Sequence, residues 1–300
     1  MKIAKVRIYC LVLLSSMLCN AWYFGHNHVA RKVLNRIKHK NMSTVKVTTY
    51  NVLSSSLSEP TYFTACTAEN LDPHARLEKI RKKLQSEIDS KSIICLQEVS
   101  QEWAGNLYGY FLQQNYHFIT ALYGSKFDGY MGVAVAIPMD KYEVSNVDIT
   151  RVADTKTILE KVPEKKPEGF IAESIDKLKR IWRSVVVIWT GNRPKPTEDL
   201  WDMVRKRQNQ MICTELQCKD TKKSFVVGTY HMPCAFRNPD MMVVHSALSA
   251  QHVQNIAKGK PHIYLGDFNF KPDSSCYSLM INGSISKNVS SYIIVLCTLI

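Results

Sequence analysis

The chain has 300 residues, of which 45% are hydrophobic and 22% are charged. This composition excludes a wholly disordered chain and predicts one large globular domain or two small ones. The formal net charge of +13 is carried largely by residues 1–58, which contain nine Lys and Arg residues and no acidic residue. Charge alone is therefore weak evidence for a nucleic-acid partner.

The first 41 residues are typical of a targeting or anchoring segment rather than of a domain. An apolar stretch at 8–24 follows basic residues and could contact a membrane, although it is at the short limit for a spanning helix. A signal peptide, an organelle presequence and a start codon placed upstream of Met42 all stay open. The nine cysteines form no Cys-x-x-Cys pair, and Cys95 lies in an apolar strand pattern. These cysteines slightly favour the cytoplasm or the mitochondrion over secretion.

From residue 45 onward, the spacing of apolar residues predicts an ordered series of strands and helices. Alternation and β-branched residues predict a strand at 45–50. Apolar residues spaced by three and four predict a helix at 73–88, with Asp72 as its N-cap. The elements expected next are a strand at 93–97, a helix at 101–114, and strands at 117–123, 131–137 and 142–149.

Residues 151–207 interrupt this rhythm with Lys-, Pro- and Glu-rich stretches, which predict a partly helical surface insertion. Because strands outnumber helices and several follow one another directly, an α+β fold with packed sheets and outer helices is favoured. We expect the domain at 42–283, followed by an atypical apolar tail at 284–300. The elements expected after the insertion are strands at 211–217, 225–230 and 262–265, a helix capped by Asn238 that ends near 257, and a helix at 273–281.

Polar side chains follow four of the predicted strands, at the point where each strand ends. They are Asn51, Glu98, His231 and the pair Asp267 and Asn269. Strand ends are where a layered fold exposes functional groups on a rigid scaffold. Carboxylates are hard ligands that suit Mg²⁺, and no Cys and His residues have the spacing of a zinc site. Each residue alone is more often a turn, surface or structural residue, but the ordered set favours a site for phosphate chemistry.

The motifs TYNVLS, CLQEV, YHMPC and GDFNFKPDSSCYSLM carry a resemblance to a known family. In this order they resemble the endonuclease/exonuclease/phosphatase (DNase I-like) superfamily. The residues of the first and last motifs are most similar to those of the nocturnin and poly(A)-deadenylase branch. The resemblance covers roughly 45–283. It implies a four-layer α/β-sandwich of two packed, mostly antiparallel sheets flanked by helices, with the site in a cleft at one edge.

The resemblance also implies a role for each polar residue. Glu98 would be the principal Mg²⁺ ligand, with Mn²⁺ as an alternative ion, and Asn51 would assist in positioning metal and phosphate. His231 would contact the scissile phosphate. Asp267 and Asn269 would orient the attacking water and the phosphate, with Asp267 able to deprotonate that water.

Two departures from the family pattern bear on activity. The stretch DGYMGVAVAIP lacks the acidic-Gly-Cys motif of the deadenylases, so specificity for poly(A) does not follow. The sequence also has no His after His262 and no acid after Asp273, whereas the family ends with a Ser-Asp-His motif and a closing strand. We therefore expect a truncated domain that lacks its last strand or strands and is impaired in catalysis.

The leading hypothesis is a Mg²⁺-dependent phosphodiester hydrolase that resembles exonucleases and deadenylases. Its substrate would be a nucleic acid, RNA more than DNA, or a nucleotide phosphate. One alternative is a catalytically impaired fragment or pseudoenzyme that binds Mg²⁺ and phosphate without turnover. Another is a phosphoesterase that acts on a phospholipid or an inositol phosphate.

Overall fold

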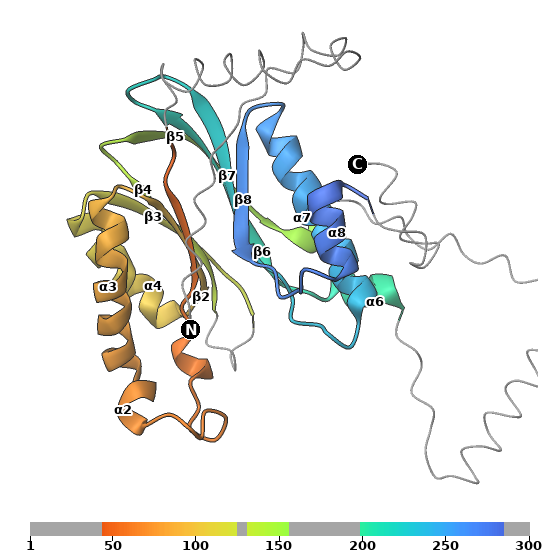
Figure 1. Cartoon of the computed structure of the whole chain (residues 1–300), viewed down its shortest axis with the longest axis horizontal. Helices are drawn as coiled ribbons and strands as arrows, with labels where there is room; N and C mark the ends of the chain where they lie inside the picture. The colour runs from red at the N-terminus through yellow and green to blue at the C-terminus, as the bar shows by residue number, and fades with distance from the viewer. Residues whose placement is uncertain (1–43, 125–130, 156–198, 285–300) are drawn as a thin grey trace, which may run out of the picture.

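The computed structural model describes residues 44–124, 131–155 and 199–284, which form two four-stranded sheets packed face to face (Figure 1). The strand order in the first sheet is β1-β2-β4-β3, and in the second it is β5-β6-β7-β8. The strands of the first sheet are β1 (Val47–Asn51), β2 (Ile93–Val99), β3 (Tyr116–Leu122) and β4 (Gly132–Pro138). Those of the second are β5 (Tyr142–Arg151), β6 (Gln210–Cys218), β7 (Ser224–His231) and β8 (His262–Asp267).

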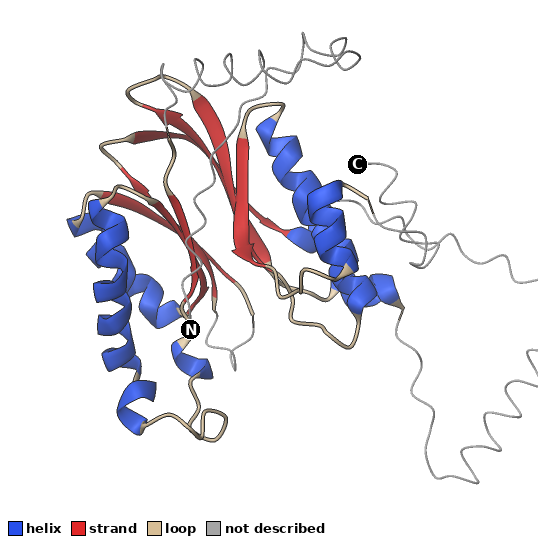
Figure 2. Ribbon diagram, viewed as in Figure 1, coloured by secondary structure: helices blue, strands red, loops and turns tan. Residues whose placement is uncertain are grey.

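Helices cover the outer face of each sheet, which makes four layers (Figure 2). The first sheet is covered by α3 (Pro73–Asp89) and α4 (Gln101–Gln113), and a short α2 (Ala68–Leu71) precedes them. The second is covered by α6 (Leu200–Arg205), α7 (Pro239–Ala257) and α8 (Ser275–Asn282). This arrangement confirms the predicted α+β sandwich with helices on its outside.

Most strand pairs are antiparallel, as predicted, but each sheet contains one parallel pair. In the first sheet β1 runs parallel to β2, with Asn51 opposite Gln97. In the second β7 runs parallel to β8, with His231 opposite Asp267. Parallel neighbours end at the same edge of a sheet, so both pairs deliver polar residues to one end of the sandwich.

The helices of the first half form where the apolar spacing predicts them. The side chains of α3 that face the sheet are buried, and Asp72 Oδ1 accepts a hydrogen bond from Ala75 N at 2.8 Å, as expected of an N-cap. Asn238 occupies the N-cap position of α7, but its side chain makes no capping bond. Pro239 in the first turn has no N–H to satisfy, which reduces what a capping side chain could contribute.

The space between the sheets is filled by apolar side chains and one buried polar bridge. Gln97, 1% exposed, accepts a hydrogen bond from Thr49 Oγ1 at 3.2 Å. Its Nε2 donates across the sandwich to Thr229 Oγ1 at 3.2 Å. A buried amide must keep its hydrogen bonds to avoid a desolvation penalty, so this bridge favours one alignment of the two sheets. The apolar residues of this layer include Ile93, Cys95, Val135, Ile212, Val227 and Leu265.

The flanks of the expected insertion lie in the core beneath α7. Val152 and Val204 are both 0% exposed and belong to the same apolar cluster as the inner face of α7. The segments at 1–43, 156–198 and 285–300 lie outside the described residues, as do the expected targeting segment, the centre of the insertion and the apolar tail. Among the described helices, none combines the length and the apolar composition of a membrane-spanning segment.

Candidate functional site

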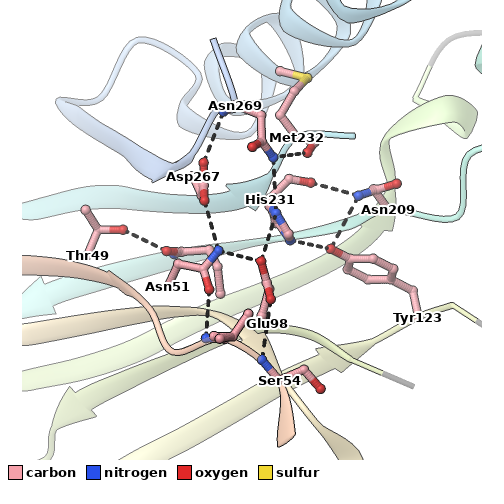
Figure 3. Close-up of polar contacts among 12 residues, drawn as sticks. Thr49, Asn51, Ser54, Glu98, Tyr123, Asn209, His231, Met232, Asp267 and Asn269 are labelled. Atoms are coloured by element: carbon pink, nitrogen blue, oxygen red, sulfur yellow. Dashed lines mark hydrogen bonds and ion pairs between the residues drawn. The ribbon is translucent and has the colours of Figure 1, made fainter. Parts of the chain in front are cut away.

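All five side chains predicted from the strand ends lie together at one end of the sandwich (Figure 3). Asn51 and Glu98 come from the first sheet, and His231, Asp267 and Asn269 come from the end of the second. Their meeting follows from the topology, because both parallel pairs end here and β1 lies next to β8 across the sandwich. The set therefore joins residues 216 positions apart in the sequence.

Asn51 lies between two carboxylates and donates to both of them. Its Nδ2 is 2.7 Å from Glu98 Oε1 and 2.9 Å from Asp267 Oδ2. Its Oδ1 accepts a hydrogen bond from Leu53 N at 2.9 Å, which fixes the orientation of the amide. A neutral donor thus holds two like charges close together without cancelling either of them.

Glu98 reaches the site because β2 is irregular at this residue. The pairing of β2 with β4 shifts register between Gln97 and Val99, and Glu98 has a φ of 59°. A left-handed φ is costly for a residue with a Cβ, and such bulges re-aim side chains near functional sites. The Glu98 side chain is 13% exposed, and its Oε2 also accepts a hydrogen bond from Ser54 N at 3.4 Å.

The end of β8 is shaped by a glycine that no other residue can replace without movement. Gly266 has a φ of 157°, and a Cβ there would lie 1.9 Å from Tyr230 O. This close approach brings Asp267 alongside His231. Asn269 N then donates to Asp267 Oδ1 at 3.1 Å, so the carboxylate is held by one donor on each oxygen.

His231 has a side chain that is 9% exposed, and both of its ring nitrogens have polar neighbours within hydrogen-bond distance. Nε2 lies 3.8 Å from Glu98 Oε1 and 3.2 Å from Asn269 Nδ2, and Nδ1 lies 3.3 Å from the hydroxyl of Tyr123. The tautomer decides whether Nε2 accepts from Asn269 or donates toward Glu98. Tyr123 suits either state, because its hydroxyl can donate or accept.

Tyr123 and Asn209 support this histidine, and neither was predicted from the sequence as a site residue. Asn209 Nδ2 donates to Tyr123 Oη at 3.3 Å and to the backbone carbonyl of His231 at 2.9 Å. Burial raises the pKa of Tyr123, so its hydroxyl stays protonated at neutral pH. Tyr123 directly follows β3 and Asn209 directly precedes β6, so a polar residue next to a strand is the signal that could have indicated them.

The donor set fits a hard divalent cation. Glu98, His231 and Asp267 each offer a ligand atom, and these atoms lie within 4.8 Å of one another. Neither carboxylate forms an ion pair with Lys or Arg among the described residues. Two carboxylates this close repel each other unless a cation lies between them, and oxygen-rich sites of this kind suit Mg²⁺ or Mn²⁺.

Comparisons with known proteins agree with the fold described above. Residues 48–280 match the sequence model of the Endonuclease/Exonuclease/phosphatase family. No curated protein matches the chain at a significant level of sequence similarity. The fold resembles ANGEL2, described as a 2',3'-cyclic phosphatase, in complex with adenosine-2',3'-vanadate, with a TM-score of 0.56 and 19% identity.

Two further solved structures share the fold. The human Nocturnin catalytic domain with bound sulfate has a TM-score of 0.55 and 17% identity, over 84% of this chain and 73% of that one. A mannosyl-6-phosphatase of Bacteroides thetaiotaomicron has a TM-score of 0.50 and 15% identity, over 80% and 70% of the two chains. The match to ANGEL2 covers 79% of this chain but only 57% of that protein.

Proposed function

Because the chain belongs to the endonuclease/exonuclease/phosphatase family, we propose that it is a Mg²⁺-dependent phosphodiester hydrolase acting on RNA or a nucleotide. The observation that carries the proposal is the convergence of Glu98, His231 and Asp267 within 4.8 Å at one end of the sandwich. A divalent ion bound there would neutralise charge on the phosphate and stabilise the leaving oxygen. Glu98 would hold that ion and Asn51 would assist in positioning it, with Mn²⁺ able to replace Mg²⁺.

Asp267 is the proposed general base. It would accept a proton from a water molecule while the water oxygen bonds to phosphorus and the bond from phosphorus to the leaving ester oxygen breaks. Donors from Asn51 and from the backbone of Asn269 hold its two oxygens at 2.9 and 3.1 Å. This fixed orientation lets the remaining lone pairs face the water without rearrangement.

His231 and Asn269 are the proposed contacts of the phosphate. When His231 carries a proton on Nε2, this N–H would donate a hydrogen bond to a phosphate oxygen, because Nδ1 is hydrogen-bonded to the hydroxyl of Tyr123. Asn269 Nδ2 donates to Met232 O at 2.9 Å, which aims its amide toward the same space as Nε2. Hydrogen-bond donors fixed in advance stabilise the charge that develops on the oxygens in the transition state.

The nature of the substrate is supported by what is known of structures with this fold. ANGEL2 is named as a 2',3'-cyclic phosphatase and is seen with an adenosine ligand. That ligand contains the ribose 2'-oxygen, which favours RNA over DNA as the substrate class for this chain. A structure with the same fold is named as a mannosyl-6-phosphatase, so a sugar phosphate is the alternative substrate class to test.

A substrate panel with purified protein and Mg²⁺ tests this proposal. It contains oligo(A), mixed RNA, RNA ending in a 2',3'-cyclic phosphate, DNA, mononucleotides and mannose 6-phosphate. We expect hydrolysis of an RNA or nucleotide substrate that EDTA abolishes and that Glu98→Gln and Asp267→Asn each reduce by roughly 100-fold or more.

Two outcomes of the panel would contradict the proposal. Turnover that is unchanged in the Glu98→Gln, Asp267→Asn double variant would refute the site assignment. Binding of Mn²⁺ by the native protein without turnover of any substrate would instead identify a protein that binds metal and phosphate but does not hydrolyse.

A further inference from the structure

The turn after β1, residues 52–54, determines where two residues of the metal site lie. Leu53 N donates to the side chain of Asn51 at 2.9 Å, and Ser54 N donates to that of Glu98 at 3.4 Å. Leu53 adopts a left-handed φ of 55°, a conformation that is strained for a residue with a Cβ. This turn therefore needs support from outside itself.

Arg76, in the first turn of α3, supplies that support. Its Nη2 donates to Val52 O at 2.9 Å and also to Leu53 O. Hydrogen bonds from a charged donor are roughly twice as strong as those between neutral groups. On its other side the turn is tied to β2, because Val52 N donates to Gln97 O at 2.9 Å.

The guanidinium is itself held in place. It lies 5.0 Å from the ring centre of Trp103, which is 1% exposed. Trp103 N donates to Ser100 Oγ at 3.2 Å, and Ser100 caps α4 directly after the end of β2. Arg76 thus connects the turn after β1 to the residues that follow Glu98. Its positive charge also attracts the Glu98 carboxylate.

We propose that Arg76 is a positioning residue of the metal site. It contacts neither Glu98 nor Asn51 by a hydrogen bond; it holds the turn whose two backbone N–H groups orient them. The inference rests on the proposed function, because it concerns the same metal site. A lysine could not replace Arg76 fully, since it donates as a point charge and lacks the planar fork that stacks on a ring.

Arg81 provides a matched control on the same helix. Its guanidinium lies 5.5 Å from the ring centre of Tyr110, and it bonds to Glu78 and to the carbonyl of Asn106. Like Arg76, it lies over an aromatic ring and donates to a backbone carbonyl, but none of its contacts is with the turn at 52–54, and it has an ion pair with Glu78 in addition. Replacing either arginine by methionine removes a stacked cation from α3, whereas only one replacement should affect the metal site.

The experiment measures Mn²⁺ affinity by electron paramagnetic resonance of the free ion, below the unfolding temperature of each variant. We expect Arg76→Met to weaken Mn²⁺ binding roughly 10- to 100-fold, the range seen when groups that orient metal ligands are lost. Arg76→Lys should weaken it less, and Arg81→Met should leave it unchanged. Circular dichroism confirms that each variant is folded.

The outcomes separate this inference from the proposed function. Native-like Mn²⁺ affinity in Arg76→Met overturns the positioning role, and if that variant does not fold, native-like affinity in Arg76→Lys does so. An equal loss of affinity in Arg81→Met also overturns it, because the effect would then be general to α3. If Glu98→Gln binds Mn²⁺ like the native protein, the metal site and the proposed function fail together.

Discussion

The replacement His245→Met is expected to remove a large part of the pH dependence of the free energy of unfolding. His245 lies on α7, is 0% exposed, and has its Nδ1 3.1 Å from the hydroxyl of Tyr230. Burial lowers the pKa of His245 from 6.5 to about 4, partly offset by the backbone of Val204 and reinforced by the charge of Arg207. The folded protein therefore keeps this imidazole neutral at pH values where the unfolded chain protonates it.

The size and sign of the effect follow from this shift. A lowering from 6.5 to about 4, at about 1.4 kcal/mol for each pH unit, corresponds to about 3 kcal/mol. The unfolded state binds the proton first as the pH falls, so the contribution is complete above pH 6.5 and is lost as the pH falls to about 4. Acidification thus destabilises the native state through this one buried residue.

Urea denaturation between pH 7 and pH 4 measures the effect. The native protein should lose about 3 kcal/mol more than His245→Met over this range. His245→Met also deprives Tyr230 of its partner, at a cost of about 1–3 kcal/mol at every pH. The double variant Tyr230→Phe, His245→Met removes that cost, so the slopes can be compared. Parallel pH profiles of the native protein and the double variant would refute the reasoning.

Two further predictions concern the site itself. Asn51→Ala removes the donor shared by the two carboxylates and should raise the dissociation constant for Mn²⁺ roughly tenfold in a calorimetric titration; an unchanged constant would contradict its bridging role. Tyr123→Phe should lower kcat/KM roughly tenfold, whereas Tyr110→Phe, which loses a 3.1 Å bond to Arg81 O, should not. Both tyrosine variants should lose about 1 kcal/mol of stability, and equal kcat/KM values would show that Tyr123 only stabilises the fold.

The order of most strands and of the longer helices was predictable because each has a clear local pattern. Apolar spacing in α3 and alternation in the strands indicated elements that the structure places within a few residues of the expected positions. The short α2 and the irregular pairing at Glu98 were not predicted, since four residues carry no helical period and a bulge leaves no mark in an apolar strand. Glu98 was identified from the sequence because it follows an apolar run. Its left-handed φ of 59° could not be predicted from that pattern.

Of the site, only the five polar residues that follow strand motifs were predictable from the sequence. These five residues lie at the ends of predicted strands within recognisable motifs. The residues that hold the site in place are far in the sequence from the groups they contact. Tyr123 and His231 are 108 positions apart, and Arg76 and Leu53 are 23 apart. On α3, Arg76 belongs to a charged face that is typical of solvent exposure. Its interaction with the turn at 52–54 depends on how α3 packs, which local spacing does not determine.

Because both sheets contribute residues to the site, the site can form only late in folding. The chain must be synthesised as far as residue 267 before Asn51 can meet Asp267, 216 positions away. Contacts between such distant residues form slowly, because they must first overcome the entropy of closing a long loop. A nascent or refolding chain should therefore acquire its secondary structure before it binds metal. We expect partly folded forms to lack whatever activity the assembled site has.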